Sequence, residues 1–155
     1  MNLKVYKIRP GAILPTRAHP TDVGMDLYYC PNGNKKLYET KNFHIPPKAS
    51  RLLPTGIKVE IPYGYMLEIK NKSGIAYKRQ LLVGACVIDP GYNGEVYVNL
   101  HNIGSETQVI KAGDKIAQAV MISIVHCRIE EVKDSQFINF NSERGDNGFG
   151  SSGRF

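Results

Sequence analysis

The chain has 155 residues and a formal net charge of +6, with 42% hydrophobic and 22% charged residues, which is typical of one globular domain and excludes a disordered chain. Its basic residues are scattered and form no long run, so the positive charge favours a small polyanionic ligand over stable nucleic-acid binding. Its three cysteines form no CxxC pair, and no apolar stretch is long enough to span a membrane. We therefore expect reduced thiols, no zinc site, no membrane partner and a cytoplasmic location (nuclear or host-cytoplasmic if the protein is viral).

Short apolar or alternating stretches, separated by Gly- and Pro-rich turns, recur along the chain and predict an all-β fold with strands at residues 3–8, 25–29, 42–47, 51–61, 65–70, 80–88, 95–102, 108–110, 115–125 and 128–132. The one predicted helix is Ser73–Arg79, with Ser73 as its N-cap. Apolar density drops after residue 133, and the last twelve residues contain four glycines. We therefore expect a β domain at residues 1–133 and a mobile C-terminal arm at 134–155.

The stretch GACVIDPGYNGEVYVNLHN, residues 84–102, contains the most informative acidic residue. Asp89 directly follows the β-branched Val87 and Ile88, and the turn dipeptides Pro90-Gly91 and Asn93-Gly94 come next. This pattern predicts a hairpin of residues 80–88 and 95–102, with Asp89 held at the end of a buried strand where it can face a pocket. Considered alone, the stretch equally fits an Asp that merely starts a turn, which is the commoner case.

Other groups have the chemistry to hold a phosphorylated ligand. Lys72, Ser73 and Gly74 open the predicted helix and combine a cation, a hydroxyl and free N–H groups, although an ordinary capped helix has the same features. The C-terminal arm combines a cation, an aromatic ring and two hydroxyls among its glycines, although a disordered tail remains an alternative. Gln118, between Ala117 and Ala119, is expected either at a sheet edge or facing a polar ligand.

Five stretches together resemble, in order and spacing, the five motifs of the trimeric dUTPase family. They are AHPTDVGMDL, NKSGIA, GACVIDPGYNGEVYVNLHN, GDKIAQAV and RGDNGFGSSG, and they span residues 18–153. The resemblance implies a distorted β-barrel or jelly roll with one short helix, assembled as a homotrimer. It implies hydrolysis of dUTP to dUMP and pyrophosphate, a reaction of nucleotide metabolism that keeps uracil out of DNA.

The resemblance also implies a role for each candidate residue. Asp89 would be the general base that activates water against the α-phosphate, and Tyr92 would pack on the deoxyribose and exclude a 2′-OH. Asp26 would orient a water on Mg²⁺, itself held mainly by the substrate phosphates. The other implied substrate contacts are Lys72, Ser73, Gly74 and Gln118 at the phosphates, the backbone of Gly84, Ala85, Cys86, Val87 and Ile88 at uracil, and Arg144, Phe149, Gly150, Ser151 and Ser152 in an arm closing over the site.

Two departures from the family pattern concern these contacts. Lys72 replaces the usual Arg and lacks its bidentate fork, and Cys86 replaces a Gly in the uracil-binding stretch. The related dCTP deaminases share the fold but need a Glu ten positions after the Asp, where this chain has Asn99. A deaminase is therefore the weaker hypothesis. A nucleotide-sensing or protein-binding module on the same fold is a second alternative, although such a module has no need of the base at Asp89.

Overall fold

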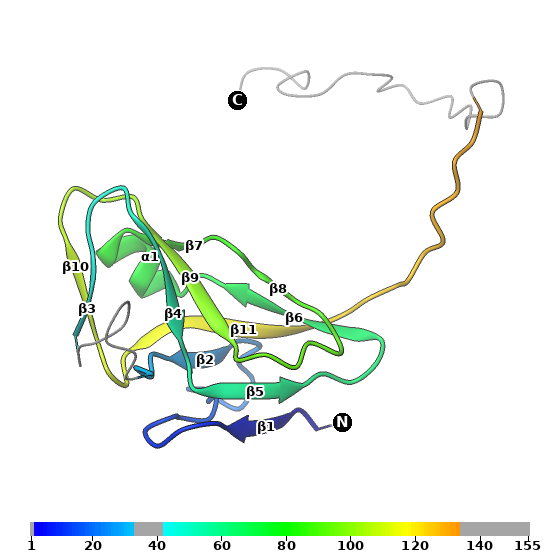
Figure 1. The fold of residues 1–155 in the computed structure, drawn as a ribbon, viewed down its shortest axis with the longest axis horizontal. Coiled ribbons are helices and arrows are strands. Elements are labelled where there is room, and N and C mark those ends of the chain that lie inside the picture. The colour runs from blue at the N-terminus through cyan, green and yellow to red at the C-terminus, as the bar shows by residue number, and fades with distance from the viewer. Residues whose placement is uncertain (1, 33–41, 134–155) are drawn as a thin grey trace. The chain divides into compact units, whose positions relative to one another are not determined.

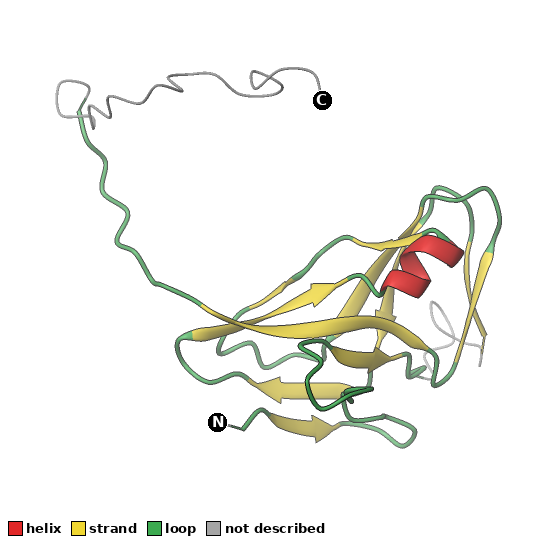
Figure 2. Cartoon of the chain, turned by 180° about the vertical axis from the view of Figure 1, so that it is seen from behind, coloured by secondary structure: helices red, strands yellow, loops and turns green. Residues whose placement is uncertain are grey.

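In the computed structural model, which describes residues 2–32 and 42–133, short strands and one helix account for the regular structure (Figures 1 and 2). The elements are β1 (Lys4–Lys7), β2 (Met25–Tyr28), β3 (Asn42–Ile45), β4 (Ser50–Pro54), β5 (Ile57–Glu60), β6 (Tyr65–Lys70), α1 (Ser73–Arg79), β7 (Leu81–Val83), β8 (Val87–Ile88), β9 (Tyr97–Asn102), β10 (Gln108–Lys111) and β11 (Lys115–Ser123). All of them belong to a compact unit of Met1–Val125, and a second unit comprises His126–Phe155. Within the described residues, no helix has the length and hydropathy of a membrane span.

The strands pair antiparallel in four sheets. The largest has the order β2-β11-β6-β8, a second has the order β4-β9-β7, and β1-β5 and β10-β3 form two-stranded sheets. The predicted all-β class with one short helix is confirmed, and the described strands do not close into a single barrel. In the largest sheet β11 lies between β2 and β6, which brings segments far apart in the sequence side by side (Figure 1).

Alternation of apolar and polar residues determines which face of each strand is buried. Along β9 and the residue before it, Val96, Val98 and Leu100 are 2%, 0% and 0% exposed and contribute to the apolar core. In β5 the apolar Ile57 and Val59 are buried, and the charged residues between and after them are exposed. Burial of one face fixes the register of these strands, because a slip of one residue would bring charged side chains into the core.

The structure corrects three details of the predicted elements. The predicted strand 51–61 is interrupted at Gly56, which has φ +74° and would place a Cβ 2.8 Å from the Cβ of Ala12. Residues 128–132 form no strand among the described residues, and Ile129 is 93% exposed. Ser73 is the first helical residue, whereas Lys72 occupies the N-cap position and makes no side-chain capping bond.

Candidate active site

The predicted hairpin around Asp89 is correct only in its first part. β7 pairs with β9, with Val83 opposite Leu100, and the N–H of Gly84 donates to the carbonyl of Asn99 at 3.0 Å. The chain then leaves β9, because the N–H of Ile69 in β6 donates to the carbonyl of Cys86 at 2.7 Å and β8 pairs with β6. β8 and β9 therefore belong to different sheets, and the space between them is not closed by a ladder.

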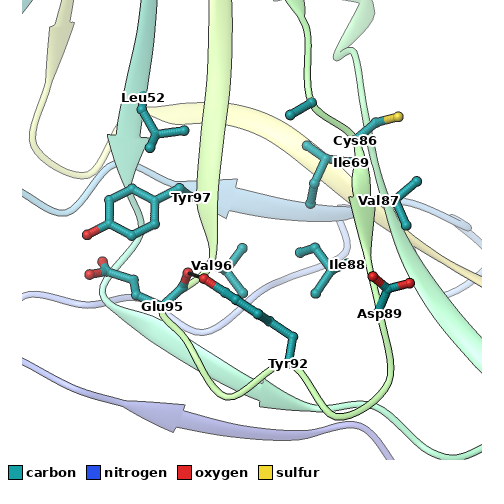
Figure 3. A pocket seen from close by; sticks show the side chains of 11 residues that line it. Leu52, Ile69, Cys86, Val87, Ile88, Asp89, Tyr92, Glu95, Val96 and Tyr97 are labelled. Atoms are coloured by element: carbon teal, nitrogen blue, oxygen red, sulfur yellow. Dashed lines mark hydrogen bonds between the residues drawn. The ribbon is translucent and has the colours of Figure 1, made fainter.

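A cavity of about 270 Å³ occupies this opening (Figure 3). The structure brings six predicted site residues together around it: Ala85, Cys86, Val87, Ile88, Asp89 and Tyr92. Leu52, Ile69, Glu95, Val96 and Tyr97 complete the lining. Most of these side chains are apolar or aromatic, as is usual for pockets that bind small molecules through a few placed polar groups.

Asp89 and Tyr92 lie at the same end of the cavity (Figure 3). Within the described part of the chain, no hydrogen bond or ion pair engages the Asp89 carboxylate, which is exposed to solvent. The N–H of Tyr92 donates to the carbonyl of Asp89 at 3.2 Å, and the Tyr92 hydroxyl donates to the carbonyl of Glu95 at 3.0 Å. The turn therefore presents a carboxylate that is exposed to solvent next to a tethered aromatic ring. The strand that precedes Asp89 was predicted to be buried, but Val87 in this strand is 57% exposed.

Asp26 forms a second charged cluster. It is 4% exposed and accepts from Lys72 Nζ at 2.5 Å through Oδ1 and from Lys115 Nζ at 2.7 Å through Oδ2. Burial would raise the pKa of Asp26, but the hydrogen bonds and charges of the two lysines outweigh it, and the pKa lies below its usual value. The same pairing raises the pKa of Lys115. Asp26 is therefore held ionised between two cations.

Gln118 lies beside this cluster, opposite Asp26 on the neighbouring strand. Because β11 is flanked on both sides, the first of the two alternatives for Gln118, a position at a sheet edge, is excluded. Its Nε2 donates to the carbonyl of Asn71 at 2.8 Å, and a Cβ on Gly24 would lie 1.8 Å from its Oε1. The absence of a side chain at residue 24 is what leaves room for the Gln118 carboxamide.

The predicted site residues thus fall into separate groups. None of Asp26, Lys72, Ser73, Gly74, Gly84 and Gln118 lines the cavity around Asp89. Ser73 and Gly74 are exposed at the start of α1, next to Lys72. Arg144, Phe149, Gly150, Ser151 and Ser152 lie outside the described residues. Among the residues that are described, no group of three His, Cys, Asp or Glu side chains could hold a metal ion, and Cys30, Cys86 and Cys127 are free thiols.

Sequence reasoning missed several residues of these groups. Lys115 precedes an apolar strand, where a lysine usually indicates a solvated strand end, yet it provides the second cation at Asp26. Glu95 follows a turn and lines the cavity, with Arg9 as its partner 86 positions away, a separation that leaves no local signal. From the sequence, Asn99 was considered only because dCTP deaminases need a Glu at this position. Asn99 accepts a hydrogen bond from the N–H of Ala85 at 3.2 Å and donates one to Ser50 Oγ at 2.8 Å.

Comparison with known proteins places these features in one family. The family model for dUTPase matches residues 11–153. Proteins named deoxyuridine 5′-triphosphate nucleotidohydrolase from Solibacter usitatus and Clostridioides difficile are 35% and 38% identical, over 99% and 98% of this chain and 97% and 98% of theirs. A mutant of the dUTPase of Staphylococcus bacteriophage 80alpha with dUpNHpp has a TM-score of 0.81 at 26% identity, covering 99% of both chains. A dUTPase mutant from phage phi11 of S. aureus, described with a structural Mg(II) ion, shares the fold at 24% identity, a TM-score of 0.76 and coverage of 92% of this chain and 100% of its own. The chain belongs to the dUTPase family.

Proposed function

We propose that the protein is a dUTP diphosphatase that hydrolyses dUTP to dUMP and pyrophosphate. The observation that carries this proposal is the exposed carboxylate of Asp89 beside Tyr92 at one end of the cavity, with no ion pair to it among the described residues, in a chain of this family. A carboxylate that is open to solvent can contact a water molecule and accept its proton as the water attacks. Asp89 is therefore the general base, and water attacks the α-phosphate.

Uracil and deoxyribose fit the cavity better than the whole triphosphate does. Its volume of about 270 Å³ lies near the lower end of the range for small-molecule pockets, roughly 300–1,000 Å³. We assign uracil to the backbone of residues 84–88. The N–H groups of Gly84 and Ala85 and the carbonyl of Cys86 already bond within the chain, so the uracil contacts fall to the other polar groups of this segment.

The phosphates require cations, and no Lys or Arg is among the described residues that line the cavity. Its two charged lining residues are the carboxylates Asp89 and Glu95; Glu95 is paired with Arg9, and the negative charge of Asp89 would not hold a triphosphate. We assign the phosphates to Lys72, Ser73, Gly74 and Gln118, with Arg144, Ser151 and Ser152 of the arm at the γ-phosphate and Phe149 over the base. Because the cation group and the cavity of one chain are separate, we propose a homotrimer in which neighbouring subunits complete each site.

The residues at Asp26 fit a magnesium ion held mainly by the substrate phosphates. Each oxygen of Asp26 accepts one lysine bond, and a carboxylate oxygen has a second lone pair that can accept from a metal-bound water. Among the described residues there is no cluster that would bind the ion directly, as is usual for Mg²⁺, which keeps several waters and binds substrate phosphates. When bound, the ion would neutralise phosphate charge, while Lys72 and Lys115 keep Asp26 ionised.

The proposal is tested by incubating the protein with each deoxynucleoside triphosphate and Mg²⁺ and identifying the products. We expect dUMP and pyrophosphate from dUTP alone, whereas dUTP formed from dCTP would favour the deaminase. Asp89→Asn removes the base and should lower turnover about 10²–10⁴-fold while a non-hydrolysable analogue still binds. Turnover near the wild-type value in this variant would refute the role of Asp89.

A further inference from the structure

We infer that Arg9 and Glu95 form a partly buried clamp that positions Tyr92, and that discrimination against ribonucleotides depends on this clamp. The inference rests on the proposed function, in which Tyr92 covers the sugar. Both residues act through Tyr92 and are positioning residues. The clamp joins the segment that follows β1 to the turn that carries Asp89 and Tyr92.

The ion pair is bidentate and largely shielded from water. Arg9 Nη1 and Nη2 donate to Glu95 Oε1 and Oε2 at 2.6 and 2.5 Å, and the two side chains are 19% and 8% exposed. This fork-to-fork geometry fixes the direction of the carboxylate as well as its distance. By contrast, Lys4 and Glu60 form a single contact at 2.8 Å with side chains 73% and 69% exposed.

A third bond attaches Glu95 to the turn between β4 and β5. The N–H of Gly56 donates to Glu95 Oε1 at 2.7 Å, and the carbonyl of Gly56 accepts from the N–H of Ile8 at 2.9 Å. Arg9 follows Ile8 directly in the chain, so the same turn holds both members of the clamp. The Glu95 carboxylate is therefore fixed from two sides by groups of the folded β unit.

The backbone of Glu95 in turn fixes the Tyr92 ring. The Tyr92 hydroxyl donates to the Glu95 carbonyl at 3.0 Å, and Figure 3 shows the ring extending from its own backbone toward Glu95. A Cβ on Gly94 would lie 2.1 Å from Tyr92 Oη, so the end of the ring lies directly against the backbone at residue 94. The position of Glu95 therefore determines where this ring lies at the end of the cavity.

Loss of Arg9 would leave a buried carboxylate with the Gly56 N–H as its remaining bond. Such a group is costly to keep in place, and Glu95 would turn toward solvent and shift its carbonyl. The Tyr92 ring would then lose its tether and tolerate a 2′-OH. We expect the ratio of kcat/KM for dUTP to that for UTP to fall about tenfold, as the loss of one neutral hydrogen bond allows.

The experiment compares Arg9→Met, Glu95→Gln and Tyr92→Phe with Lys4→Met as the matched control. For each protein, kcat/KM is measured for dUTP and UTP, and Kd is measured for dUMP and UMP by calorimetry. Glu95→Gln keeps the size of the side chain and an acceptor for Gly56, so it serves if Arg9→Met fails to fold. We expect the deoxy-to-ribo ratio to fall in all three variants and to stay unchanged in Lys4→Met.

A double variant shows whether the clamp acts through Tyr92. Once Tyr92→Phe has removed the bond to the Glu95 carbonyl, adding Arg9→Met or Glu95→Gln should change the ratio little further. An unchanged ratio in the single variants, or full additivity in the double variant, would overturn the inference. If the wild type binds the monophosphates but does not hydrolyse dUTP, the proposed function fails and the Kd ratios still decide the clamp. If it neither hydrolyses dUTP nor binds either monophosphate, both are overturned.

Discussion

Replacement of Asp26 by Asn tests the charged cluster at the start of β2. The Asp26 side chain is 5% exposed and accepts one bond from each of two lysines, whose side chains are 29% and 45% exposed. Asn keeps one carbonyl acceptor and turns an NH₂ group toward the other lysine, so one charge-assisted hydrogen bond is lost. Such a bond contributes about 1.5–3 kcal/mol. Because Lys115 can turn into water, we expect the free energy of unfolding to fall by about 2 kcal/mol.

The pH dependence of this loss is specific to Asp26. Its folded-state pKa lies below the usual value, so its ionised form stabilises the fold above the unfolded pKa of about 3.9, and this contribution is lost as pH falls through the folded pKa. The stability difference between wild type and Asp26→Asn should therefore be full at pH 7 and shrink below about pH 4. Near neutral pH it corresponds to a melting temperature lowered by about 4–8 °C.

The assay is thermal and urea unfolding of both proteins at one concentration from pH 7 to pH 3, because association makes stability depend on concentration. Glu60→Gln, which removes an exposed partner of Lys4, is the control and should leave stability unchanged. A difference that persists undiminished at pH 3, or none at pH 7, would refute the view that the two lysines stabilise an ionised Asp26.

Three further predictions concern the ligand site and the assembly. Tyr92→Ala should gain relative activity on UTP, measured as the ratio of kcat/KM values, and an unchanged ratio would place the sugar selection elsewhere. Gly24→Ala puts a Cβ 1.8 Å from Gln118 Oε1 and should displace the Gln118 carboxamide. We expect KM for dUTP to rise with little change in melting temperature. An unchanged KM would show that Gln118 does not bind the phosphates. Light scattering should give three times the chain mass of 17.3 kDa, and a fully active monomer would contradict the shared site.

Local sequence was sufficient for elements whose ends carry their own signals. β6 and α1 have the predicted bounds, and Tyr63-Gly64 turns the chain before β6. The end of α1 is a left-handed Gln80, a residue that the sequence assigned to the following strand. The buried face of β9 followed from alternation, because strand geometry alone puts every second side chain in the core. Asp89 and Tyr92 line one cavity, because they are only three positions apart on one turn.

Pairings between distant segments were not predictable from local sequence. Val87 and Ile88 have the β-branched composition of a strand, but composition does not tell whether they pair with β9 or β6. The contact of Arg9 with Glu95 spans 86 positions, and each residue alone resembles an ordinary surface charge. Antiparallel pairing of β2 and β11 puts Lys115 opposite Tyr28, two positions from Asp26, a register that no short motif specifies.

Two carboxylates of this chain have opposite environments, and their roles follow from that difference. Asp26 is buried and paired with two lysines, so its negative charge is neutralised and it is a poor proton acceptor. Asp89 is exposed, and no ion pair engages it within the described residues. A lysine placed beside Asp89 would help to bind a phosphate but would also occupy the carboxylate that we propose as the base. In each chain the lysines at Asp26 form a group separate from Asp89, which avoids this conflict. In the shared site that we propose, a substrate phosphate would lie between Asp89 of one subunit and the cations of another.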